Sequence, residues 1–115
     1  MKRGEVWWAG LEPRSGSEQR GHRPVLVVSH DAFNQTQGWL SIIVVPISTS
    51  PRQAQRGPTA VSVGGGAAGL APESLALCHQ VTTLDRRKLT RCLGAVPAQV
   101  LDAVQAGLKI AMNLP

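Results

Sequence analysis

Residues 23–29, Arg23-Pro24-Val25-Leu26-Val27-Val28-Ser29, contain the apolar run that says most about the fold. Four successive apolar residues, three of them β-branched, are typical of a strand that is buried on both faces. A second run of this kind, Ile42-Ile43-Val44-Val45, lies within the segment from Trp39 to Ile47. The two runs predict two largely buried strands.

Shorter strand patterns lie on either side of these runs. Glu5 to Leu11 is expected to form a first strand, with Val6, Trp8 and Leu11 inward and Trp7 on the other face. Further strands are expected at residues 59–63, 75–81 and 91–96, with a short helical turn over residues 84–89.

The last element has apolar residues at the spacing of a helix rather than of a strand. After Pro97, a residue suited to the first turn of a helix, apolar side chains follow one helical face. These are Val100, Leu101, Val104, Leu108, Ala111 and Met112. Short strands followed by one helix predict a mainly β (α+β) fold, a small antiparallel β-barrel with a C-terminal α-helix, as a single domain over residues 1–115.

Composition narrows the class of protein. Twelve basic and seven acidic residues give a net charge of +5, which favours polyanionic partners such as nucleic acid. No apolar run approaches the roughly 20 residues that cross a bilayer, and no signal-peptide pattern follows the N-terminus. Cys78 and Cys92 both lie in apolar strand-like runs, so we expect them to be reduced and buried. We therefore expect a cytoplasmic protein with no membrane association.

The polar stretch before the first apolar run concentrates reactive side chains. It reads Gly16-Ser17-Glu18-Gln19-Arg20-Gly21-His22-Arg23. Cleavage of RNA by its own 2′-hydroxyl needs a proton acceptor, a proton donor and a group that stabilises charge on phosphorus. Glu18, His22 and Arg23 are chemically able to fill these roles. The alternative is that the stretch is only a solvated charged loop.

Other polar clusters are open to two interpretations. Ser48, Thr49 and Ser50 end a predicted strand and could bind phosphate oxygens, although hydroxyl residues at strand ends are also ordinary turn formers. His79-Gln80 is suited to reading base edges or to a structural role. The three tryptophans, Trp7, Trp8 and Trp39, either stack on bases or pack in the core.

Several of these motifs together resemble one known family. Gly4-Glu5-Val6-Trp7, Leu11-Glu12-Pro13 and residues 16–27 closely resemble the opening of the MazF/PemK (Kid) toxin family. Residues 45–49, Val45-Pro46-Ile47-Ser48-Thr49, residues 80–85 and the final helix continue the match in the family's order. The resemblance covers essentially the whole chain.

The resemblance implies an SH3-like barrel that forms a homodimer, with an RNA groove along the interface and a MazE-like cognate antitoxin. Members of this family are mRNA interferases that cut single-stranded RNA at short motifs. They leave a 2′,3′-cyclic phosphate or 3′-phosphate and a 5′-hydroxyl. The resemblance therefore implies a metal-independent, sequence-selective endoribonuclease toxin without a metal or other cofactor, and no carboxylate or histidine cluster with metal-ligand spacing opposes this expectation.

The resemblance also implies roles for individual residues. The family's catalytic arginine corresponds to Arg23, and its conserved hydroxyl, usually threonine, corresponds to Ser48, with Thr49 as the alternative. Glu18 is expected to act in catalysis as proton acceptor or as organiser of Arg23. Side-chain chemistry, rather than the resemblance, gives the residues expected to contact RNA, which are Gln19, Arg20, His22, Thr49, His79 and Gln80.

Departures from the family leave alternatives open. Some relatives have histidine where this chain has Ser17 and aspartate where it has His79, so their acid–base scheme does not carry over intact. Because serine replaces the usual threonine at position 48, one alternative is that the protein is an inactive, RNA-binding relative of these toxins. A gyrase-poisoning toxin of the CcdB kind is the other alternative, but the chain ends Ala111-Met112-Asn113-Leu114-Pro115 without that class's tryptophan-containing tail.

Overall fold

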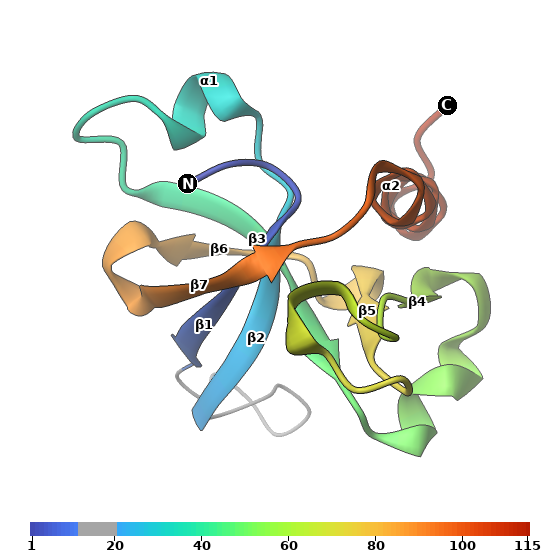
Figure 1. The fold of residues 1–115 in the computed structure, drawn as a ribbon. Helices are drawn as coiled ribbons and strands as arrows, with labels where there is room; N and C mark the ends of the chain where they lie inside the picture. Colours follow the sequence, from blue (N-terminus) through green and yellow to red (C-terminus); the bar gives the residue numbers. More distant parts are fainter. Residues whose placement is uncertain (12–20) are drawn as a thin grey trace.

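The computed structural model describes residues 1–11 and 21–115, without the side chain of Arg56. The strands are β1 (Glu5–Leu11), β2 (Gly21–Val27), β3 (Ser41–Ser48), β4 (Ala60–Ser62), β5 (Leu75–Leu77), β6 (Thr82–Asp85) and β7 (Leu89–Ala95). The helices are α1 (Asp31–Asn34) and α2 (Ala98–Met112), with 3-10 turns η1 (Pro51–Thr59), η2 (Ala67–Gly69), η3 (Cys78–Gln80) and η4 (Arg86–Lys88). The predicted mainly β fold with a C-terminal helix is confirmed (Figure 1).

The strands form one antiparallel sheet in the order β4-β5-β3-β2-β1-β7, and β6 pairs with β3. The long strand β3 is shared, because its first half pairs with β6, its middle with β2 and its end with β5. Within residues 1–11 and 21–115 no ladder joins β7 to β6 or to β4. The sheet is therefore bent around its core without closing into a complete barrel.

The two apolar runs are largely buried, as predicted, except at Ile43 of the second run, which is 42% exposed. Successive side chains of a strand point to opposite faces, so Leu26 and Val45 enter one core cluster. Val25, Val27 and Val44 enter a second cluster on the other side of the sheet. A strand that is covered on both sides needs an uninterrupted apolar run, and that is what β2 and β3 supply.

Helix α2 covers the first cluster. It begins after Pro97, and Val104 and Leu108 are buried against the sheet. The predicted apolar face is confirmed except at Met112, which is 47% exposed because it lies in the last turn, past the residues that pack on the sheet. No helix in the described part of the chain is both long and apolar enough to cross a membrane.

The predicted inward face of β1 is wrong in part. Val6 packs in the first cluster, whereas Trp7, Ala9 and Leu11 pack with the second. Leu11 lies five positions after Val6, an odd step, so the alternation of a strand places them on opposite faces. Because β1 is a central strand, between β2 and β7, both of its faces carry apolar residues.

The predicted helical turn over residues 84–89 is also wrong in part. Leu84 and Asp85 belong to β6, where they pair with Ile42 and Ser41, and only Arg86–Lys88 forms a 3-10 turn. Hydrogen bonds from the side chain and backbone of Arg87 hold the pKa of Asp85 well below its usual range. A four-residue strand has little pattern of its own, so its pairing with β3 decides its conformation.

The remaining strand predictions need smaller changes. The strand expected over residues 75–81 ends at Leu77, because Cys78–Gln80 forms a turn. The last strand begins at Leu89 rather than at residue 91. Helix α1 was not predicted, since it has only four residues, and the side chain of His30 caps it by accepting a hydrogen bond from the Ala32 N–H at 2.9 Å.

The two cysteines differ in exposure, so the prediction that both are buried is wrong for Cys92 on β7. Burial raises the pKa of the Cys78 thiol to about 11, which keeps it protonated and unreactive. We therefore expect one rapid equivalent of thiol modification in the folded protein at pH 8, measured with a chromogenic disulfide reagent. Cys92→Ser should remove it, and a second rapid equivalent would contradict this assignment.

Candidate functional site

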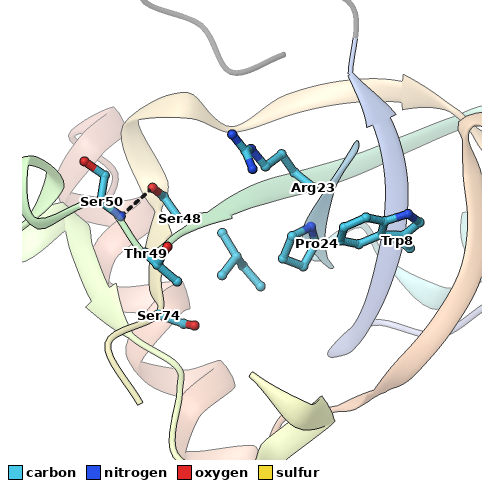
Figure 2. A pocket seen from close by; sticks show the side chains of 8 residues that line it. Trp8, Arg23, Pro24, Ser48, Thr49, Ser50 and Ser74 are labelled. Atoms are coloured by element: carbon cyan, nitrogen blue, oxygen red, sulfur yellow. Dashed lines mark hydrogen bonds between the residues drawn. The ribbon is translucent and has the colours of Figure 1, made fainter. Parts of the chain in front are cut away.

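A pocket opens where β2 and β3 part. The last pair of their ladder is Val25 with Pro46. Beyond this pair, the end of β3 pairs with β5, whereas the start of β2 pairs only with β1. The space between the diverging strands holds a pocket of about 340 Å³ (Figure 2). Its lining residues are Trp8, Arg23, Pro24, Ile47, Ser48, Thr49, Ser50 and Ser74.

Arg23 supplies the positive charge of this pocket. Its backbone is held by β1, where it pairs with Ala9, and its side chain is exposed. No hydrogen bond or ion pair joins the guanidinium to any residue of the described ranges, and Figure 2 shows it directed over the pocket. A guanidinium offers five donors in a planar fork that matches phosphate, so a firmly held backbone presents an anion-binding group here.

Hydroxyl groups lie on the β3 side of the pocket. The Ser48 Oγ accepts a hydrogen bond from the Ser50 N–H at 3.1 Å, which orients the side chain and leaves its O–H able to donate. Thr49 is exposed and also lines the pocket. Extending the β2–β3 register past its last pair would set Ser48 opposite Arg23. A guanidinium and a hydroxyl that line the same pocket can bind the oxygens of one phosphate.

The β1 side of the pocket is apolar. Trp8 pairs with Pro24 across β1 and β2, and both residues line the pocket. The rings of Trp8 and His22 lie nearly parallel, with centroids 6.1 Å apart and an interplanar angle of 17°. Flat apolar groups beside a phosphate-binding group form a surface on which a nucleic acid base can stack.

The structure places the predicted site residues in different regions. Glu18, Gln19 and Arg20 lie outside the described residues. Arg23, Ser48 and Thr49 come together in the pocket, and His22 lies beside it against Trp8. His79 and Gln80 belong to η3 and do not line the pocket; the His79 Nδ1 is 2.6 Å from the Thr59 Oγ1.

Ser50 belongs to the hydroxyl cluster that the sequence singled out, whereas Ser74 was not predicted as a site residue. Ser50 orients Ser48, as described above, and Ser74 comes from the segment just before β5. Nothing in the residues around Ser74 marks it as functional. Only the pairing of β3 with β5 brings it to the pocket, so the sequence pattern carried no signal for it.

Comparison with known proteins identifies the family of this chain. The profile of the PemK-like, MazF-like toxins of type II toxin–antitoxin systems matches residues 2–112. The endoribonuclease EndoA of Bacillus subtilis is 33% identical over 114 residues, covering 99% of this chain and 96% of EndoA.

Solved structures with the same fold include MazF from Deinococcus radiodurans. Its TM-score is 0.81 at 27% identity, covering 99% of this chain and 97% of that one. A MazE–MazF crystal structure from the same organism has a TM-score of 0.76 at 26% identity, covering 100% and 97%. Because the family profile spans nearly the whole chain, this protein belongs to the PemK-like, MazF-like toxins of type II toxin–antitoxin systems.

Proposed function

We propose that this protein is an endoribonuclease toxin that cuts single-stranded RNA, including mRNA, at selected sequences and without a metal ion. The observation that carries the proposal is that Arg23 and Ser48 line one pocket where β2 and β3 part. Membership in the toxin family and the 33% sequence identity with the endoribonuclease EndoA support the proposal. The net charge of +5 favours a polyanionic substrate.

The proposed reaction is an internal transfer within the RNA. The 2′-oxygen attacks the adjacent phosphorus, the bond to the 5′-oxygen breaks, and the products are a 2′,3′-cyclic phosphate and a 5′-hydroxyl. One proton leaves the 2′-hydroxyl and one is added to the 5′-oxygen, so water is not consumed in this step. The Arg23 guanidinium stabilises the charge that builds on the phosphate oxygens, and the Ser48 hydroxyl donates to the same group.

Proton transfer is assigned separately from charge stabilisation. An arginine at its ordinary pKa is a poor proton donor, so the Arg23 role is electrostatic. Glu18 is proposed as proton acceptor or as organiser of Arg23, and His22, beside Trp8, as an RNA contact. Gln19, Arg20, Thr49, His79 and Gln80 are proposed as further RNA contacts.

The proposed partners follow from the relatives and from the surface. A structure of the Deinococcus MazF includes MazE, and we propose a MazE-like cognate antitoxin that occupies the RNA groove. Exposed apolar side chains, among them Phe33, Trp39 and Leu40, support a homodimer, because such patches on a small protein are typical of interfaces. The proposed place of action is the cytoplasm, where mRNA is available.

Cleavage in the presence of EDTA tests the proposal. Purified protein is incubated with a long single-stranded RNA in excess EDTA, and the new 5′ ends are mapped. We expect cuts at a limited set of positions with 5′-hydroxyl ends, and none with Arg23→Ala protein purified in parallel. Cleavage that requires Mg²⁺ would contradict metal independence, and absence of cleavage with inhibition of gyrase would favour the CcdB-like alternative.

Light scattering tests the proposed dimer separately. The expected molar mass is twice the 12.2 kDa of one chain. A mass of one chain at micromolar concentration would contradict the homodimer.

A further inference from the structure

The hydroxyl of Ser74 has an unusual environment. Ser74 is only 2% exposed, yet it lines the same pocket as Arg23 and Ser48. No hydrogen bond joins this hydroxyl to any residue in the described ranges 1–11 and 21–115. Figure 2 shows the hydroxyl directed toward the pocket, on the other side from Arg23 in that view. A buried polar group without a partner is costly, so such a group in a pocket points to a ligand.

The backbone of Ser74 is firmly held. Its N–H donates to the Ala71 carbonyl at 3.0 Å, and its carbonyl accepts from the Val63 N–H at 3.0 Å. Gly64 lies so close to this segment that a Cβ there would come within 1.9 Å of the Ala71 oxygen. The packing of Gly64 against Ala71 therefore fixes the position of the serine, and its hydroxyl needs little reorganisation to meet a ligand.

We infer that Ser74 donates or accepts a hydrogen bond with the sugar or base of the nucleotide that occupies this pocket. The inference rests on the proposed RNA substrate and makes Ser74 a positioning residue rather than a catalytic one. In the proposed mechanism the Arg23 guanidinium and the Ser48 hydroxyl bind the phosphate, and Trp8 and Pro24 form a surface on which a base can stack. A hydroxyl can both donate and accept, as a ribose hydroxyl or a base edge requires.

The test compares Ser74→Ala with Ser62→Ala, the same change at an exposed serine of β4 that does not line the pocket. The first measurement is the affinity for a short RNA that spans a mapped cut site and carries a 2′-deoxy group at the attacking position. The second is kcat and KM for the cleavable RNA. For Ser74→Ala we expect Kd and KM to rise about 3- to 10-fold with kcat nearly unchanged, because the bond is equally present in substrate and transition state.

Denaturant unfolding separates this role from a structural one. Removal of an unpartnered buried hydroxyl should leave the midpoint of unfolding unchanged or raise it, whereas loss of an internal hydrogen bond would lower it. A lowered midpoint, or Kd and KM equal to those of Ser62→Ala, would overturn the inference while leaving RNA cleavage intact. If the wild-type protein neither binds nor cuts RNA, the proposed function and the inference both fail.

The pattern of cuts identifies the contacted group. Mapping the ends produced by Ser74→Ala on the long RNA should give one of two supporting results. A uniform loss at all sites indicates a contact to the sugar, and a changed preference among sites indicates a contact to a base edge.

Discussion

Replacement of Arg23 by alanine is expected to lower kcat/KM for RNA cleavage by at least about 100-fold, the scale for losing one strong donor to developing charge. The guanidinium lies over the pocket, held by the pairing of its backbone with β1. Its removal leaves the phosphate without charge-assisted hydrogen bonds as charge builds on the oxygens. The measurement is the initial rate on a short RNA that spans a mapped cut site, in EDTA.

The fold of the Arg23→Ala protein should be nearly unaffected. The side chain is exposed and has no partner within the described ranges, so the free energy of unfolding should change by less than about 0.5 kcal/mol. Arg87→Ala is a charge-matched control for the cleavage assay, because it removes the same charge from the turn between β6 and β7, outside the pocket, although it also removes the ion pair with Asp85. Arg23→Lys should also cut poorly, since an ammonium cannot reproduce the planar fork. Normal cleavage by folded Arg23→Ala protein would remove Arg23 from the mechanism.

Replacement of Ser48 by alanine is expected to have the second largest effect, a loss of about 10-fold or more in kcat/KM. The Ser48 hydroxyl lines the pocket and is oriented by the Ser50 N–H, so it can donate to the phosphate. Ser48→Thr should retain activity, because threonine keeps the hydroxyl and its methyl group restricts the rotamers. The rates are measured on the same RNA as for Arg23→Ala.

Thr49→Ala decides between the two neighbouring hydroxyls. Thr49 lines the same pocket but is more exposed than Ser48, so we expect a smaller loss than for Ser48→Ala. If Ser48→Ala cuts normally and Thr49→Ala does not, Thr49 supplies the phosphate contact. If both cut normally, neither hydroxyl is required and Arg23 must act with residues of the polar stretch that precedes it in the sequence, Glu18 first among them.

The long, strongly patterned elements could be predicted from the sequence. The central strands follow from uninterrupted β-branched runs, and α2 follows from apolar residues at helical spacing after Pro97. The short elements could not be predicted from the sequence. Strand β6 and helix α1 have four residues each, too few for a period to be recognised, and contacts with β3 or a capping side chain decide them.

The predicted site residues divide in the same way. Arg23 and Ser48 could be chosen because each lies at the end of a strongly apolar strand, and family resemblance gave those positions a role. His79 and Gln80 were chosen for their chemistry alone, and the structure places them in η3, outside the pocket. Side-chain chemistry can be read from sequence, but the direction in which a short turn presents it depends on neighbouring elements.

The sequence by itself determined a mainly β chain with a C-terminal helix and a basic net charge, because the period of apolar residues and the count of charges are local properties. Only the tertiary structure decided where β3 leaves β2 for β5. That divergence opens the pocket, sets Ser48 and Arg23 on its walls and brings the buried Ser74 hydroxyl to it. Strand pairing joins residues far apart in the chain through backbone hydrogen bonds, and every residue type except proline has the same backbone groups, so no local pattern specifies which strands meet.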